Sequence, residues 1–115
     1  MRVLRTVPNV PSRDLSQSRR FYGETLGYCV VMDLGWIVTF ASPTDPAAQV
    51  SVISREPSGL HPNVSVEVDD VDAAHAEMRR QGVEVVYPLR DEPWGVRRFF
   101  VRDPGGTVVN VVMHR

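Results

Sequence analysis

The chain contains no lysine, one cysteine and three histidines among its 115 residues. All 13 cationic residues are therefore arginine, and the formal net charge at pH 7 is -1. A chain without a cationic surplus neutralises few phosphates, which argues against nucleic acid or an acidic membrane surface as a partner. The single cysteine, Cys29, excludes an internal disulfide and is typical of a reducing compartment.

Long apolar runs are missing too. No stretch approaches the roughly 18 apolar residues expected of a membrane-spanning helix, and the first residues have no signal-peptide pattern. We therefore expect a cytoplasmic protein. The hydrophobic fraction of 43% and the charged fraction of 23% are typical of a globular protein. The length suits one domain, residues 1–115, with a core of its own.

Established catalytic signatures are also missing. There is no Ser/His/Asp pattern, no glycine-rich phosphate loop before a helix, and no evident activating partner for Cys29. Glu67 is the candidate for a general base, if it lies in an apolar pocket. Arg97 and Arg98 are candidates for binding an anion, although charges beside a turn are usually solvated. The sequence therefore gives little support to catalysis.

A regular order of strands and helices is present instead. The first twelve residues alternate weakly and contain two prolines, which favours an edge or interrupted strand. Asp14 is a predicted helix N-cap, with Gln17 three residues on as in a capping box, and Gly27 follows the predicted helix. Three strands are then predicted, at residues 28–32, 36–41 and 49–54.

The same order starts again after a linker at residues 56–62. Residues 63–68 alternate as a strand does, and Asp69 or Asp70 then caps a second helix that Gly82 ends. Strands follow at residues 83–88, 98–102 and 108–113. The last two flank Asp103-Pro104-Gly105-Gly106, a strong turn signal that predicts a hairpin with a slightly long loop. Pro93-Trp94-Gly95 is a predicted corner, whose indole either covers a cleft or covers the core.

The two halves form an internal repeat. Thirteen positions separate Asp14 from Gly27, and thirteen separate Asp69 from Gly82. Each half, about residues 1–56 and 60–115, therefore predicts one β-α-β-β-β unit. We expect an α+β fold in which two tandem units form curved mixed sheets around a shared cleft, with the helices outside.

These features resemble the vicinal oxygen chelate superfamily, which includes glyoxalase I, extradiol dioxygenases and bleomycin-resistance proteins. The resemblance rests on the paired units, on Asp14-Leu15 with Phe21-Tyr22 and Leu26-Gly27, and on the closing segment 94–106. It covers nearly the whole chain. Residues 9–14, followed by Gly35-Trp36, look most like the bleomycin-binding branch.

The resemblance implies where a metal would be held. Metal-dependent members use four His, Glu or Gln side chains, one from each of four strands facing the cleft. Counted from the shared anchors, these positions are Val7, Ser51, Asn63 and Asn110 here. Valine cannot ligate a metal, and neutral oxygens bind Zn²⁺, Ni²⁺ or Fe²⁺ far more weakly than imidazole or carboxylate. We therefore expect no metal and no cofactor.

A relocated metal site is the alternative. By strand parity, Glu67 shares the cleft face with Asn63, and His114 shares it with Asn110, while His61 lies just before that strand. A site of His61, Glu67 and His114 is thus conceivable, although its ligands would come from a linker and a chain end. In the simpler interpretation all three histidines, including His75, are surface groups.

The cleft face would combine amides, a carboxylate, an arginine and aromatic rings, which suits an amphipathic, partly planar organic ligand. Trp36, Val38 and Phe40 share one face of their strand, which is either part of this cleft or part of the core. Glu67 would face a cationic group of the ligand. The predicted ligand-binding residues are Arg5, Asn9, Trp36, Val38, Phe40, Ser51, Asn63, Ser65, Glu67, Trp94 and Asn110.

Three functions follow from these observations. The first is a metal-free binding protein, similar to the bleomycin-resistance branch, that sequesters a natural product and does no chemistry on it. The second is an enzyme, such as an isomerase, lyase or dioxygenase-like member, with a relocated metal or a metal-free acid/base mechanism. The third is an accessory module that only dimerises. A homodimer is expected because residues 108–112 are apolar on both faces and need cover on both sides.

Overall fold

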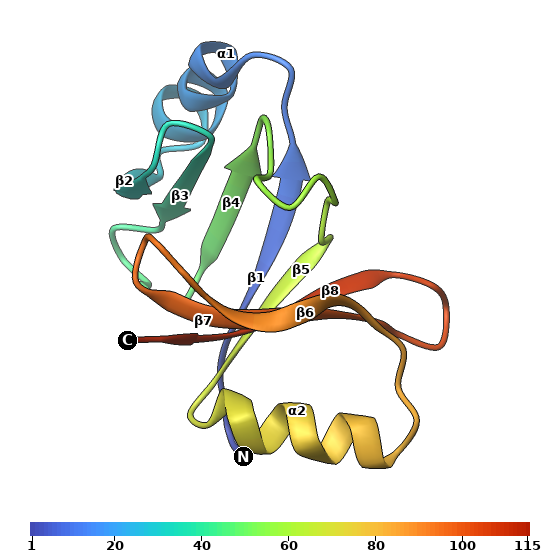
Figure 1. The fold of residues 1–115 in the computed structure, drawn as a ribbon. Helices are drawn as coiled ribbons and strands as arrows, with labels where there is room; N and C mark the ends of the chain where they lie inside the picture. The colour runs from blue at the N-terminus through green and yellow to red at the C-terminus, as the bar shows by residue number, and fades with distance from the viewer. The chain divides into compact units, whose positions relative to one another are not determined.

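The computed structural model describes all residues, Met1–Arg115, and repeats the order β-α-β-β-β twice (Figure 1). The predicted α+β fold is confirmed, and its strands pair in both parallel and antiparallel fashion. The elements are β1 (Val3–Pro11), α1 (Leu15–Arg19), the π-helix η1 (Arg20–Thr25), β2 (Cys29–Asp33), β3 (Ile37–Ala41), β4 (Gln49–Ile53), β5 (Val64–Val68), α2 (Val71–Arg80), β6 (Val85–Glu92), β7 (Val96–Arg102) and β8 (Val108–His114).

The chain divides into two compact units. The N-terminal unit is Val7–His61, and the C-terminal unit is Met1–Thr6 together with Pro62–Arg115. Strand β1 contributes residues to both units and is hydrogen-bonded to β4 in the N-terminal unit and to β5 in the C-terminal unit. The expectation of an edge strand was therefore wrong, because β1 has a neighbour on each side. The strand order is β1-β4-β3-β2 in the N-terminal unit and β1-β5-β8-β7-β6 in the C-terminal unit.

The core of the N-terminal unit lies between its sheet and its helix. Four buried side chains, Val38, Phe40, Val50 and Val52, pack with Leu15, Tyr22 and Tyr28 among others. Rings supply much of this contact, since the centroid of Phe40 is 5.5 Å from that of Tyr22 and 6.5 Å from that of Tyr28. The apolar stripe predicted for the first helix therefore faces the sheet.

The first helix starts at its predicted cap. The Asp14 carboxylate accepts hydrogen bonds from the backbone N–H groups of Ser16 and Gln17, at 3.0 and 3.2 Å. The reciprocal bond of a capping box is made by another residue, because the Asp14 N–H donates to Ser12 Oγ at 3.2 Å. The prediction that Gln17 makes this reciprocal bond was therefore wrong. Ser12, which precedes the cap in the sequence, accepts it instead.

The equal spacing predicted for the two helices is off by one residue. Asp70 is the N-cap of α2, since its carboxylate accepts from the Ala73 N–H, while Asp69 accepts from the Arg2 N–H. The first helix is thus one residue longer between its cap and its terminal glycine. A π-helix contains an extra residue per turn, and η1 at Arg20–Thr25 absorbs that residue.

The core of the C-terminal unit lies between its sheet and α2. Val68, Val71, Ala74, Phe99, Val101 and Val111 are its buried members. Glycines end both helices as predicted: Gly27 and Gly82 have φ values of 84° and 77°, which glycine adopts without the penalty that a Cβ imposes. His75 stacks edge-on against Phe99 at 4.9 Å and is half-buried, so it is not simply solvent-facing.

Strands β6 and β7 are longer than predicted. They form a hairpin in which Glu92 pairs with Val96 across Pro93-Trp94-Gly95, so the predicted corner is the turn of that hairpin. The sequence ended β6 at Pro88, yet the strand continues past this residue because the register slips between Tyr87 and Arg90. The predicted hairpin of β7 and β8 is confirmed, with Arg102 opposite Val108.

Candidate functional site

One face of the sheet in the C-terminal unit is polar. The strand register places Ser65 opposite Asn110, and Glu67 and Arg98 on either side of Val112. The opposite face packs against α2. We call this side of the sheet, with the β6–β7 turn, the polar face; it comprises Arg5, Ser65, Glu67, Tyr87, Arg90, Glu92, Trp94, Arg98, Phe100, Asn110, Val112 and His114.

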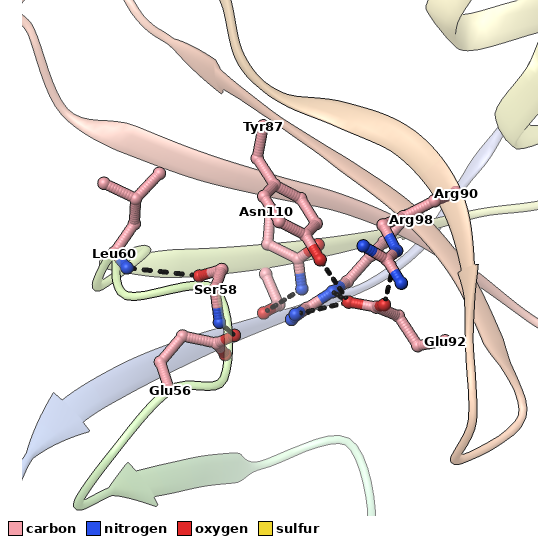
Figure 2. A network of polar contacts seen from close by, with 9 residues as sticks. Glu56, Ser58, Leu60, Tyr87, Arg90, Glu92, Arg98 and Asn110 are labelled. Carbon is pink, nitrogen blue, oxygen red and sulfur yellow. Dashed lines mark hydrogen bonds and ion pairs between the residues drawn. The ribbon is translucent and has the colours of Figure 1, made fainter.

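A buried ion pair lies at the centre of one half of the polar face. The side chains of Arg98 and Glu92 are each only 3% exposed, and Nη2 of Arg98 is 2.7 Å from Oε2 of Glu92. Tyr87 donates its hydroxyl hydrogen to the same carboxylate at 2.8 Å, and Arg90 approaches its other oxygen at 3.0 Å. Figure 2 shows these groups converging on Glu92.

Aromatic rings surround the Arg98 guanidinium. Its central carbon lies 4.8 Å from the ring centroids of Trp94 and Phe100 and 5.2 Å from that of Tyr87. Rings at this distance stabilise a cation, more strongly when it is shielded from water. Burial raises the pKa of the Tyr87 hydroxyl, and the hydrogen bond to Glu92 raises it further. Trp94 therefore packs on a charged group of the polar face.

Asn110 has a fixed orientation and an unused acceptor. Its amide nitrogen donates to Ser65 Oγ at 3.0 Å, and its Oδ1 is buried with no hydrogen-bond partner. A buried polar atom without a partner costs about 1–3 kcal/mol. Native proteins keep few such atoms, and those that persist commonly have a functional reason.

Glu67 has two polar neighbours, Arg5 in an ion pair and His114 in a hydrogen bond. Its Oε1 is 3.1 Å from Nε of Arg5, and its Oε2 is 2.7 Å from Nδ1 of His114. The predicted role of Glu67 toward a cationic ligand group is therefore not supported, because both carboxylate oxygens already have protein partners. An ionised carboxylate only accepts hydrogen bonds, so Nδ1 of His114 carries the proton and Nε2 is the free nitrogen.

The chain end that carries His114 is held in place. His114 belongs to β8 and lies opposite Val96 of β7, and the backbone N–H of Arg115 donates to the Gly95 carbonyl at 2.9 Å. The pairing of β8 with β7 continues to the last residues, and it positions His114 beside Glu67.

The two residues of β3 that were predicted to bind the ligand belong to the core. Val38 and Phe40 are 1% and 0% exposed and pack under the first helix, so their assignment to the ligand-binding face is wrong. The residue opposite Ser51 is Thr39, and their hydroxyls are 2.7 Å apart. Trp36 precedes β3 and is half-buried, and its carbonyl accepts from the Ser54 N–H.

The two arginines proposed to bind an anion have other partners. Arg98 is paired with Glu92, and Arg97 lies 3.0 Å from Asp72 and 3.4 Å from Asp91. The hydrogen bond with Asp72 raises the pKa of Arg97. Sequence reasoning missed Glu92 and Tyr87 because it ended β6 at Pro88. The alternation of Arg98 and Phe100 was the available signal for a polar face.

A comparison with protein families decides the relationship. The model described as "Glyoxalase/Bleomycin resistance protein/Dioxygenase superfamily" matches residues 3–111. The chain belongs to this superfamily. A comparison with curated proteins finds no match.

Solved structures of the superfamily and beyond share the fold. Methylmalonyl-CoA epimerase from Mycobacterium tuberculosis is 22% identical, with a TM-score of 0.79 over 98% of this chain and 89% of that one. A glyoxalase/bleomycin resistance protein/dioxygenase superfamily member from Vibrio splendidus 12B01 is 18% identical, with a TM-score of 0.73 over 96% and 98%. A chain presented as NAD-dependent benzaldehyde dehydrogenase from Legionella pneumophila is 15% identical, with a TM-score of 0.76 over 96% and 99%. Such low identities show a common fold and not a common reaction.

The four superfamily metal positions hold neutral groups in both units. In the N-terminal unit, Val7 is 4% exposed and Ser51 is bonded to Thr39. In the C-terminal unit, Asn63 is exposed, whereas Asn110 is bonded to Ser65. These side chains do not fit the imidazole and carboxylate chemistry that divalent transition metals prefer.

Two members of the alternative ligand set lie in the C-terminal unit and one in the N-terminal unit. Glu67 and His114 meet in the C-terminal unit, while Nε2 of His61 lies 3.0 Å from the Asn9 carbonyl within the N-terminal unit. Neither unit gathers three or more His, Cys, Asp or Glu side chains that could hold a metal.

No helix is long and apolar enough to cross a membrane.

Proposed function

We propose that this superfamily member binds a small, amphipathic and partly planar organic molecule on the polar face of its C-terminal unit, and does no chemistry on it. The observation that supports the proposal is that this face contains buried charged groups and half-buried rings, although apolar side chains would stabilise the fold at least as well. Burying an ion pair rarely adds stability over well-packed apolar side chains. The cost is understandable if the face serves recognition.

The chemistry of the face defines the ligand class. Tyr87 and Trp94 are half-buried, so each ring has an edge or face available for stacking, which contributes about 0.5–1.5 kcal/mol per ring pair beyond area burial. We propose that a ligand group that reaches the buried Oδ1 of Asn110 donates the hydrogen bond that this atom lacks. A planar natural product with an N–H or O–H group matches both requirements.

The two tryptophans make the test selective. The variant Trp36→Phe leaves Trp94 on the polar face as the only indole, and Trp94→Phe leaves only Trp36 in the N-terminal unit. We expect bleomycin and other planar natural products, titrated singly, to quench the fluorescence of Trp36→Phe saturably for at least one compound. The same compound should leave the emission of Trp94→Phe nearly unchanged.

The outcome that contradicts this proposal is equally clear. If every compound leaves the Trp36→Phe emission and the thermal midpoint unaltered, the polar face is not a binding site for this class. If the signal appears only in Trp94→Phe, the ligand binds in the N-terminal unit and the assignment of the site fails.

An acid/base enzyme is the second candidate, and the contact between His114 and Glu67 favours it. The carboxylate holds Nδ1–H of the imidazole at 2.7 Å, and the His114 side chain is 49% exposed, so Nε2 is available to take a proton from a substrate. This step needs only residues of the chain.

Proton exchange separates the two candidates. The purified protein is incubated in D₂O with methylmalonyl-CoA, the substrate named for one similar fold, and with simpler 2-oxo acids, with and without Mn²⁺, Ni²⁺ or Fe²⁺. Binding without chemistry predicts no deuterium at the carbon next to the carbonyl. Exchange that His114→Gln abolishes would replace our first proposal with the second. Exchange that only an added metal restores would point to a relocated metal site.

The biological role that we propose is sequestration of a toxic natural product in the cytoplasm, as in antibiotic resistance. The free thiol of Cys29 is compatible with a reducing compartment. Expression in a drug-sensitive bacterium should raise the inhibitory concentration of the compound found by tryptophan quenching. An Asn110→Leu variant expressed to the same level should not.

A further inference from the structure

A hollow of about 690 Å³ lies within the N-terminal unit, at the ends of two neighbouring strands. Strands β1 and β4 run parallel and finish side by side, with Pro11 opposite Ile53 and the Ser12 N–H donating to the Ile53 carbonyl at 2.8 Å. No residue of the polar face contributes to it. The hollow is lined by Pro11, Ser12, Arg13, Ile53, Ser54, Arg55, Glu56, Gly59, Leu60 and His61.

The cations of this hollow are exceptional in the chain. Nine of the 13 arginines form ion pairs with carboxylates. Arg13 and Arg55 are among the four that form none, and both line the hollow. The other two, Arg20 and Arg79, lie on helices elsewhere. Two unpaired guanidinium groups at one hollow attract an anion, since each presents several N–H donors in a fixed plane.

The loop that closes the hollow is fixed by its own hydrogen bonds. Glu56 accepts from the Ser58 N–H at 3.1 Å, and Ser58 Oγ accepts from the Leu60 N–H at 3.2 Å (Figure 2). The Gly59 N–H donates to the Glu56 carbonyl at 3.0 Å, and its φ of 79° suits glycine. The wall is therefore formed before any ligand arrives, which lowers the entropy cost of binding.

His61 is fixed in the same way. Its Nε2 lies 3.0 Å from the Asn9 carbonyl oxygen, and because a carbonyl oxygen only accepts hydrogen bonds, Nε2 carries the proton. Apolar surface is supplied by Pro11, Ile53 and Leu60, and hydroxyls by Ser12 and Ser54. Glu56 is 8% exposed, and its carboxylate accepts a hydrogen bond from the Ser58 N–H within the same loop.

We propose that this hollow is a binding site for a small organic monoanion, separate from the polar face. The anionic group, a carboxylate, sulfonate or phosphate ester, lies against Arg13 and Arg55. The apolar body of the ligand lies on Pro11 and Leu60. A single anionic group is enough to contact both of the unpaired cations.

The probe for the test is 1-anilinonaphthalene-8-sulfonate, a monoanion with an apolar aromatic body whose fluorescence rises on binding. It is titrated into the full-length protein and into three variants that circular dichroism shows to be folded. The double variant Arg13→Ala/Arg55→Ala should bind it about tenfold more weakly, because both charge-assisted contacts are lost. The control Arg20→Ala/Arg79→Ala removes the same total charge elsewhere and should bind it like the wild type.

The polar-face variant Asn110→Leu keeps this proposal apart from the proposed function. It should retain the sulfonate probe fully, even where the natural product no longer binds. Equal affinities of the two double variants would overturn the anion site, as would the absence of any saturable signal with the wild type. Loss of the probe in Asn110→Leu alone would place the probe on the polar face and also refute the site.

Discussion

At the scale of single residues, we expect the loss of the buried Glu92 carboxylate to destabilise the protein strongly. Glu92→Ala leaves the Arg98 guanidinium, itself 3% exposed, without its main counter-charge, and such a loss destabilises a protein by about 3–5 kcal/mol. The measurement is urea unfolding of the variant and the wild type. The matched control is Glu84→Ala, which removes an exposed partner of Arg102 and should cost about 0–1 kcal/mol. Equal effects of the two variants would refute the central role of Glu92.

The Tyr87 hydroxyl reports on the same network. Its pKa is raised from the ordinary 10.0 by burial first and by the bond to Glu92 second. Glu92→Gln should therefore lower the pKa of Tyr87, but not to the ordinary value, since the burial remains. An NMR titration of the tyrosine rings in alkali checks this shift. Tyr22 and Tyr28 serve as internal controls because they lie in the N-terminal unit.

Asn110 should show opposite effects on binding and on stability. Asn110→Leu replaces the amide by an apolar group of similar size and removes an acceptor that has no partner, at the loss of one bond to Ser65. We expect the free energy of unfolding to change by less than about 1 kcal/mol, whereas binding of the natural product is lost. A large loss of stability with binding intact would mean that Asn110 has a structural role only.

At the scale of elements, the helix caps were the most readable features of the sequence. Asp70→Ala removes the acceptor of the Ala73 N–H and should cost about 1 kcal/mol of stability. Asp70→Asn keeps a side-chain oxygen at the cap and should cost much less. Urea unfolding of both variants makes the comparison. If the two variants lose equal stability, the cap is not the source of the effect.

The π-helical turn that accommodates the extra residue of the first helix could not be predicted from the sequence in the same way. An N-cap and a C-terminal glycine mark where a helix begins and ends, but they do not say how the turns between them are wound. The extra residue between the cap and the glycine is accommodated by the π-helical turn at Arg20–Thr25. This turn belongs to the helix that carries Tyr22 onto Phe40, so side-chain packing decides the winding.

At the scale of the whole molecule, acid should weaken the fold. Five carboxyl groups have a pKa below the ordinary value, each because hydrogen bonds to N–H or O–H groups stabilise the anion. A carboxyl group whose pKa is lower in the folded than in the unfolded protein stabilises the fold. This contribution is fully present above the unfolded pKa, which is 3.8 for Asp and 4.5 for Glu. It is lost as the pH falls through the lower pKa of the folded protein. The groups are Asp14, Asp33, Asp69, Asp72 and Glu77.

Unfolding midpoints in urea between about pH 6 and pH 2 test this expectation. The midpoint should hold above the unfolded values and decline steadily below them. Asp69→Asn should flatten the decline, because its anion is stabilised chiefly by the Arg2 N–H. A midpoint that rises on acidification would contradict the assignment.

A homodimer is still expected, although for another reason. Both faces of β8 are already covered, since Val111 is 2% and Val112 6% exposed, so the strand does not need a partner. Exposed apolar side chains lie on the edge strand β2 instead, where Val30 and Val31 are 43% and 55% exposed. Light scattering at micromolar concentration should give a dimer mass, and Val31→Lys should shift it toward the monomer. A monomer in the wild type would end this expectation.

The sequence by itself determined the order β-α-β-β-β, its repetition and the membership of the superfamily. These features depend on short-range signals, such as a capping aspartate, a glycine with positive φ, and alternation along one strand. It also showed that the four metal positions carry Val7, Ser51, Asn63 and Asn110, because identities at counted positions need no coordinates.

Only the tertiary structure decided which side chains face one another. The face of β3 that packs on the first helix follows from the pairing of Thr39 with Ser51, and a shift of one residue in this register would have exchanged Phe40 for Thr39. The partners of Glu67 are equally distant in sequence, since His114 lies 47 residues away. Long-range pairing of this kind depends on how the strands align, and no local pattern in the chain encodes that alignment.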